Sequence, residues 1–239
     1  MNSSLRNKPV FYVCATILAR NVKDAERFAH DAIGKGADLV EIRLDYLENI
    51  VDHINELNIP WSKSIITLRS KPQGGLFNGD ELDAVNIMKT LSRLRPCFID
   101  VELDIAHKYP EFLSEIKGLT NIIVSWHDIN STPEFNVLRE RALKCVKLGD
   151  FGKVVTTARS IGDSIKILKL YKLKNPKYKN RLVAFSMGEQ GFFSRVLSLV
   201  LGNPIFYVAY REKAAPGQIN LEEGLRIAEI IRSEELDKR

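Results

Sequence analysis

The stretch Phe151-Gly152-Lys153-Val154-Val155-Thr156-Thr157-Ala158 decides how this chain is interpreted. Apart from Lys153, it has the apolar and β-branched composition of a buried β-strand. An ammonium inside such a strand needs water or a partner, because burial disfavours the charged form. Lys153 therefore either packs its stem and extends its head into solvent at the strand end, or serves as a reactive amine. Lysines that form imines have pKa values lowered to about 7 or 8, where tens of per cent of the amine is uncharged.

Outward from this strand, short apolar runs alternate with helical patterns along the whole chain. Residues 22–35 and 81–94 carry apolar side chains at helical spacing. Asn21 and Asp80 are predicted helix caps, Thr132-Pro133 has the order of a cap followed by proline, and four glycines stand near predicted helix ends: Gly34, Gly36, Gly118 and Gly149. The predicted strands span residues 10–17, 39–44, 64–68, 97–103, 121–126, 152–157, 181–186 and 205–210.

Eight strand and helix units predict the α/β class and a (β/α)8 TIM barrel, with residues 1–239 forming a single domain. The strands are continuous Val, Ile, Leu and Phe runs, as expected for parallel strands covered on both faces. A doubly wound open sheet is the alternative. It is disfavoured because no G-x-G-x-x-G turn follows the first strand and no P-loop is present.

Composition narrows the class of protein. The 239 residues are 45% hydrophobic and carry a net charge of +5, enough apolar content for a full core. Cys14, Cys97 and Cys145 are odd in number and lack C-x-x-C spacing, which predicts reduced thiols and a cytoplasmic location. The basic residues between positions 166 and 181 fit a solvated helix face, since no nucleic-acid motif accompanies them. No apolar run is long enough for a membrane span, so we expect neither nucleic acid nor membrane as a partner.

Polar residues recur where the predicted strands end, which is where barrel enzymes place their active sites. Of the four histidines only His127 stands at a strand exit, so it is the best candidate for a general acid or base. His127 and Asp128 lack the spacing of a zinc motif, and we expect no metal and no cofactor. The polar residues at strand exits are Glu41, Arg43, Asp45, Arg69, Asp100, Glu102, Asp104, His127, Asp128, Lys153, Ser186, Glu189, Arg211, Glu212 and Lys213.

Three arginines indicate an anionic substrate. Arg43, Arg69 and Arg195 present forked donors that suit a carboxylate or several hydroxyl groups. A phosphate would fit the same chemistry, but the usual glycine-rich cradle after the last two strands is not obvious. This favours a carboxylate.

Taken together, these residues resemble type I 3-dehydroquinate dehydratase, across essentially the whole chain. Each fragment is weak alone, but six in family order at strand exits, or in the helix just after, are specific. The fragments are Glu41-Ile42-Arg43-Leu44-Asp45, Thr67-Leu68-Arg69, Ser125-Trp126-His127-Asp128, Gly152-Lys153, Phe185-Ser186-Met187-Gly188 with Ser194-Arg195, and Ala215-Pro216-Gly217-Gln218.

The resemblance implies dehydration of 3-dehydroquinate to 3-dehydroshikimate in the shikimate pathway of aromatic amino acid biosynthesis. Lys153 would form the Schiff base and His127 would be the general acid and base. Arg195 would bind the carboxylate, and Gln218 would lie in a covering loop. A homodimer is also implied. Glu41, Arg43 and Arg69 would hold substrate hydroxyls, and Thr16 is a further hydroxyl position.

Two positions depart from the family pattern. Gln73 stands before Gly74-Gly75 where many members have a glutamate, which puts a carboxylate partner for His127 in doubt, and Ala214 replaces a frequent serine. Two other functions remain open. Another Schiff-base barrel lyase, such as a class I aldolase, would share the lysine, and a barrel that only binds a metabolite would need neither nucleophile nor base.

Overall fold

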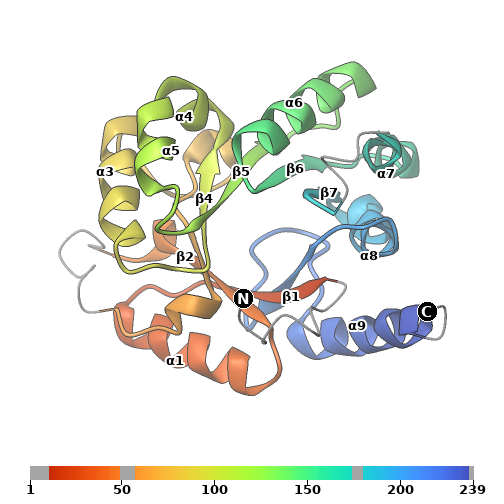
Figure 1. Ribbon diagram of the computed structural model, residues 1–239. Coiled ribbons are helices and arrows are strands. Elements are labelled where there is room, and N and C mark those ends of the chain that lie inside the picture. Colours follow the sequence, from red (N-terminus) through yellow and green to blue (C-terminus); the bar gives the residue numbers. More distant parts are fainter. Residues whose placement is uncertain (1–10, 49–56, 174–179, 237–239) are drawn as a thin grey trace.

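Eight parallel strands form one sheet that curves into a barrel, and helices surround it (Figure 1). The computed structural model describes residues 11–48, 57–173 and 180–236. Each strand pairs with its neighbour in sequence from β1 to β7, and β8 pairs with β1, so β7 and β8 flank the remaining seam. The strands are β1 (Tyr12–Ile17), β2 (Leu39–Arg43), β3 (Ser64–Thr67), β4 (Phe98–Glu102), β5 (Asn121–Asp128), β6 (Phe151–Thr157), β7 (Leu182–Met187) and β8 (Ile205–Tyr210).

The predicted barrel is confirmed, and each strand end lies within two residues of its predicted position. Three parts of these predictions lie outside the described residues. They are Val10 in the first predicted strand, the histidine His53, and the basic residues between positions 174 and 179. None of the described helices has the length and apolar character needed to cross a membrane. The helices are α1 (Val22–Gly34), α3 (Glu81–Ser92), α4 (Leu103–Lys108), α5 (Pro110–Ile116), α6 (Phe135–Leu148), α7 (Ile161–Leu168), α8 (Phe192–Val200) and α9 (Leu221–Leu236).

Side-chain caps set the first turns of the predicted helices. The Asn21 side chain accepts a hydrogen bond from the Asp24 backbone nitrogen, and Asp80 and Asp83 form a reciprocal capping box. The prediction that Thr132 caps a helix is wrong, because α6 begins at Phe135. The Thr132 hydroxyl instead bonds to Thr156 Oγ1 and to the carbonyl of Thr157 on β6, and these contacts compete with capping.

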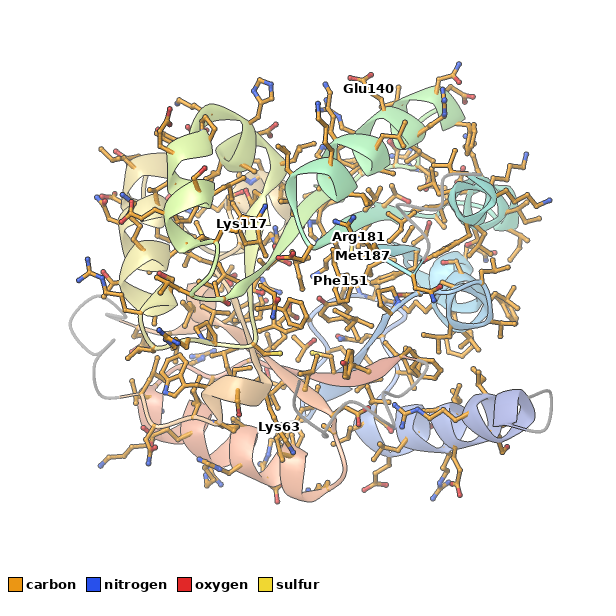
Figure 2. All side chains as sticks on the ribbon, in the orientation of Figure 1. Lys63, Lys117, Glu140, Phe151, Arg181 and Met187 are labelled. Atoms are coloured by element: carbon orange, nitrogen blue, oxygen red, sulfur yellow. The ribbon has the colours of Figure 1, made fainter. Side chains whose placement is uncertain are left out.

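Apolar side chains form two layers, one between strands and helices and one inside the barrel. Strand side chains alternate between these layers with a period of two. The inner layer fills the interior of the barrel, and Phe151, labelled in Figure 2, packs against it. Its buried members are Cys14, Leu39, Ile65, Phe98, Ile123, Val155, Val183, Phe185, Ile205 and Tyr207.

The same alternation places polar residues inside the barrel, nearer the carboxyl ends of the strands. Two residues beyond inward-facing Leu39 is Glu41, and two beyond Phe98 is Asp100. On β6, Lys153 lies two residues beyond Phe151, which packs against the inner layer. The register therefore directs these charged side chains to one end of the barrel, above an apolar floor.

Candidate active site

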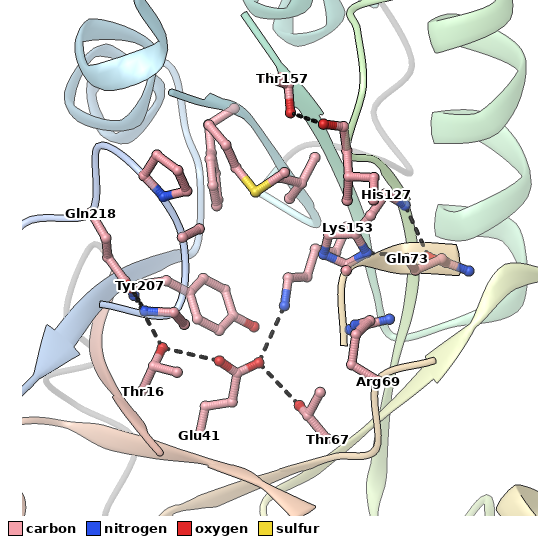
Figure 3. A pocket seen from close by; sticks show the side chains of 18 of the residues that line it. Thr16, Glu41, Thr67, Arg69, Gln73, His127, Lys153, Thr157, Tyr207 and Gln218 are labelled. Carbon is pink, nitrogen blue, oxygen red and sulfur yellow. Dashed lines mark hydrogen bonds and ion pairs between the residues drawn. The ribbon is translucent and has the colours of Figure 1, made fainter. Parts of the chain in front are cut away.

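A cavity of about 280 Å³ opens at the carboxyl ends of the strands (Figure 3). The barrel brings together residues that lie far apart in the sequence, from β1 to the loop before α9. Every predicted site residue contributes to its wall: Glu41, Arg43, Arg69, His127, Lys153, Arg195 and Gln218.

Lys153 is only 5% exposed, so the alternative of a solvent-exposed head is wrong. Its amine lies 3.1 Å from Asp100 Oδ2 and 3.3 Å from Glu41 Oε1. The amine also lies 4.1 Å from the ring centroid of Tyr207. Two carboxylates and an aromatic face thus stabilise a cation at the position of the amine.

Asp100 is the centre of a buried ionic network. It accepts hydrogen bonds from Arg69 at 2.7 Å and from Ser125 at 2.5 Å, besides its contact with Lys153. Burial alone would raise the pKa of Asp100, but the charges of Arg69 and Lys153 outweigh it and hold the pKa well below its usual range. Asp100 therefore remains ionised and fixes the direction of both cations.

Arg69 distributes its donors among three side chains of the network. One terminal nitrogen bonds to Asp100, and the other bonds to Glu102 at 3.1 Å and to Ser125 at 2.8 Å. Burial acts to lower the pKa of Arg69, but Asp100 and Glu102 raise it above its ordinary value. Arg69 lines the cavity as a permanently charged wall whose position is set by its partners.

Glu41 is held by hydroxyl donors from the two neighbouring strands. Thr16 on β1 and Thr67 on β3 each donate to one of its oxygens at 3.0 Å. Gln218 donates in turn to Thr16 Oγ1 at 3.3 Å, and Gln218 Oε1 accepts from the Ala214 backbone nitrogen at 2.8 Å. The loop that carries Gln218 is thereby connected to Glu41 through Thr16.

The partner of His127 is the neutral side-chain amide of Gln73, and not a carboxylate. Gln73 Oε1 lies 3.0 Å from the His127 backbone nitrogen and 3.2 Å from Nδ1. The backbone N–H can only donate, so the Gln73 atom that faces it is the oxygen. Because this oxygen can only accept, Nδ1 is the ring nitrogen that carries the hydrogen and donates to it. The other ring nitrogen, Nε2, is left with a free lone pair.

The pKa of His127 lies well below its usual value. Burial is the largest cause, and the positive charges of Arg69 and Lys153 act in the same direction. The imidazole is therefore neutral at pH 7, the state required of a general base.

Two glycines allow Gln73 to reach His127. A short 3-10 turn, Lys71–Gln73, ends at Gly74, whose φ of 84° lies in the left-handed region. A Cβ on Gly75 would stand 2.0 Å from the Arg69 carbonyl oxygen. The chain can therefore fold back over β3 only without side chains at these two positions.

Among the residues that the structure describes, Arg195 on α8 has no acidic partner, unlike Arg43 and Arg69. It is 3% exposed, its Nε makes no hydrogen bond, and its guanidinium carbon lies 4.5 Å from the Phe185 ring centroid. Burial lowers the pKa of Arg195 to about 10. A buried guanidinium without a counter-ion, on the wall of a cavity, is suited to bind an anion.

Arg43 combines a bidentate ion pair with a place on the cavity wall. Its Nε and one terminal nitrogen bond to the two oxygens of Asp45, at 2.8 and 2.7 Å. Asp45 also accepts from the backbone nitrogen of Leu76, which fixes the β3–α3 loop. The pair thus orients Arg43 and the loop that carries Gln73.

Several polar residues at strand exits do not enter the cavity. Asp104, Glu189 and Arg211 are exposed, and Arg211 stacks over Phe28 on the outside of the barrel. Ser186 is buried but faces outward, bonded to Thr156. Alternation along each strand explains this result, because only one residue in two can face inward.

Tyr207 and Thr67 also line the cavity, although they were not among the predicted site residues. Tyr207 belongs to the apolar run Ile205–Tyr210 and carries no charge, so its residue type did not indicate a place in the site. The phase of β8 could have identified it, because Ile205 and Tyr207 alternate with outward-facing neighbours. No group of three or more His, Cys, Asp or Glu side chains is placed to hold a metal ion in the described part of the chain.

Comparison with known proteins agrees with this architecture. The structure of type I 3-dehydroquinate dehydratase from Clostridium difficile, with covalently modified comenic acid, has a TM-score of 0.84 at 22% identity and covers 95% of this chain and 94% of its own. The 3-dehydroquinate dehydratase of Aquifex aeolicus has a TM-score of 0.76 at 24% identity, over 92% of this chain and 98% of its own. At these identities the structures show the fold alone.

The relatives found by sequence have higher identity to this chain than these solved structures. The 3-dehydroquinate dehydratase of Methanopyrus kandleri is 34% identical over 224 residues, 92% of this chain and 99% of the relative. That of Pyrobaculum aerophilum is 33% identical over 88% of this chain and 67% of the relative. The sequence model of the type I 3-dehydroquinase family matches residues 13–235. The chain therefore belongs to the type I 3-dehydroquinase family and is a dehydratase of the lyase class.

Proposed function

We propose that this enzyme removes water from 3-dehydroquinate through an imine on Lys153, with His127 as general base and general acid. One observation carries the proposal. The buried amine of Lys153 opens to the same cavity as the buried guanidinium of Arg195, which has no carboxylate partner among the described residues. A ring that bears both a ketone and a carboxylate would satisfy the two groups at once.

The reaction begins at the ketone. Lys153 first loses the extra proton of its ammonium, and the uncharged amine attacks the carbonyl carbon. A proton then returns to the former carbonyl oxygen, which leaves as water, and a protonated imine forms. The carboxylates of Glu41 and Asp100, already within 3.3 Å of the nitrogen, stabilise its positive charge. The imine acidifies the adjacent C–H bond because it accepts the electron pair that the departing proton leaves behind.

His127 then transfers the proton. Its neutral Nε2 removes hydrogen from the carbon next to the imine, and the electron pair moves toward nitrogen to give an enamine. The enamine returns that pair and expels the tertiary hydroxyl, which the imidazolium protonates as it leaves. Hydrolysis of the conjugated imine releases the enone product and restores the lysine.

The remaining residues orient the ring. Arg195 would bind the carboxylate through its free donors, which places the leaving hydroxyl near His127. Glu41, Arg43 and Arg69 line another part of the wall and would contact substrate hydroxyls. Gln218 would close the site from the loop before α9. Their roles are chiefly in positioning, because the reacting bonds are served by Lys153 and His127.

Borohydride trapping tests the proposal directly. Protein mixed with 3-dehydroquinate and reduced should carry one substrate-sized adduct, mapped by mass to Lys153, and unreduced protein should produce enone absorbance. Lys153→Met should show no adduct and lose roughly 10⁴-fold or more in kcat. An adduct on another lysine would overturn the assignment. Cleavage into two fragments would indicate an aldolase, and binding without turnover would indicate a metabolite-binding barrel.

A further inference from the structure

The hydroxyl of Tyr207 is a second polar group on the wall of the cavity that has no partner in the described part of the chain. The residue is 4% exposed. Its oxygen and Arg195 Nε are two of the three buried side-chain polar atoms that make no hydrogen bond within the described residues. Both residues line the same cavity. Buried hydroxyls are almost always hydrogen-bonded, so an exception beside a substrate pocket points to a bond that the ligand supplies.

Tyr207 stands close to the reacting nitrogen. The Lys153 amine lies 4.1 Å from its ring centroid, and Figure 3 shows the ring beside the end of the Lys153 side chain. His127 is on β5, which pairs with β6, the strand of Lys153, and Tyr207 is on β8, which lies on the other side of β6, beyond β7 and the seam. A ring attached to Lys153 would therefore present different edges to the two residues.

The phenol is suited to donate. Burial, followed by the negative charge of Glu41, raises the pKa of Tyr207 well above its ordinary value, so the hydroxyl keeps its proton. The nearby Glu41 oxygens already accept from Thr16, Thr67 and Lys153. The donor of Tyr207 therefore remains available to an oxygen of the ligand.

We infer that Tyr207 is a substrate-binding residue whose hydroxyl donates a hydrogen bond to the substrate hydroxyl on the carbon next to the imine. The inference rests on the proposed function, because the imine on Lys153 fixes where the ring lies. Two ring carbons flank the imine carbon of 3-dehydroquinate. One is the methylene group that gives its proton to His127. The other carries a hydroxyl, which is the group that accepts the hydrogen bond from Tyr207 on the opposite side of the imine.

The substitution Tyr207→Phe tests this bond while keeping the aromatic face over the amine. KM should rise about tenfold with kcat within about threefold of wild type, the effect of one lost hydrogen bond to bound substrate. The thermal midpoint should be no lower than that of wild type, because the deleted hydroxyl makes no hydrogen bond to any residue in the described ranges. Tyr12→Phe is the matched control, since it removes a phenol from β1 at the opposite end of the barrel.

A substrate analogue without this hydroxyl identifies the acceptor. Wild type should use the analogue about tenfold less well than 3-dehydroquinate, and Tyr207→Phe should show no further loss. An unchanged KM for Tyr207→Phe, or an equal loss on both substrates, would overturn the inference. Borohydride trapping separates that failure from failure of the proposed function. A Lys153 adduct in wild type would leave the imine mechanism standing, whereas absence of the adduct would overturn both.

Discussion

Gln73 Oε1 accepts from both the backbone nitrogen and Nδ1 of His127, at 3.0 and 3.2 Å. One amide oxygen thereby fixes the position of the residue and the tautomer of its ring, and it adds no charge. Family members with a glutamate at this place would fix the same tautomer and also stabilise the imidazolium. The difference between the two side chains is therefore expected in the pH dependence of the reaction.

Gln73→Glu should move the acid limb of kcat/KM to higher pH by about one unit, because a carboxylate raises the pKa of the adjacent imidazole. In wild type the limb should lie below pH 6.5, since burial, Arg69 and Lys153 all lower the pKa of His127. Rates measured from pH 4 to 9 check both statements. Gln73→Ala, which removes the acceptor without adding charge, is the control, and an unmoved limb in Gln73→Glu would contradict the prediction.

Arg195→Met should raise the free energy of unfolding by about 1 kcal/mol, because it replaces an unpaired buried charge by an apolar side chain. The same variant should lose at least about 100-fold in kcat/KM, because the substrate carboxylate loses its charge-assisted donors. Urea denaturation and steady-state kinetics provide the two values. Arg195→Lys should recover part of the activity, since it restores charge without the fork. A variant that is both less stable and fully active would refute this account.

Asp100→Asn should lower the free energy of unfolding by about 3–5 kcal/mol at pH 7. The reason is that Arg69 and Lys153 would both lose the negative charge of a buried ion-pair partner. The control is Asp104→Asn, at an exposed position on α4, which should change stability by less than about 0.5 kcal/mol.

The sign of the pH effect follows from the lowered pKa of Asp100. Its contribution to stability is fully present above its ordinary value of 3.8 and is lost as the pH falls toward the folded-state pKa. Wild type should therefore lose stability more steeply than Asp100→Asn below pH 3.8. Parallel curves of unfolding free energy against pH would contradict the prediction.

Gly217→Ala should displace the loop that carries Gln218. Gly217 has a φ of 75°, and a Cβ there would stand 2.4 Å from the Gly188 carbonyl oxygen. KM should rise about tenfold as Gln218 shifts, with a stability loss of about 1–3 kcal/mol from strain. Gly34→Ala is the matched control, since its Cβ would meet no atom within 4 Å. Normal kinetics for Gly217→Ala would show that the position of this loop does not affect catalysis.

The sequence by itself determined the barrel and the charged residues on its cavity wall. Continuous apolar runs separated by helical spacing leave few ways to bury both faces of a parallel sheet, so the eight strands could be located to within two residues. Lys153, His127 and Arg195 could be selected because charged residues in such strands, or just beyond them, are chemically unusual.

Only the tertiary structure decided which polar groups have partners. Asp100 and Asp104 both stand near the end of the fourth strand, yet Asp100 is buried against Lys153 and Asp104 is exposed. Tyr207 belongs to an apolar run in the sequence, and only the position of β8 in the barrel shows that its ring lies beside the Lys153 amine. Which groups are partners depends on contacts between segments distant in sequence, such as the 3.0 Å hydrogen bond that the His127 backbone nitrogen donates to Gln73. These distances are fixed by how the barrel closes and cannot be obtained from local spacing.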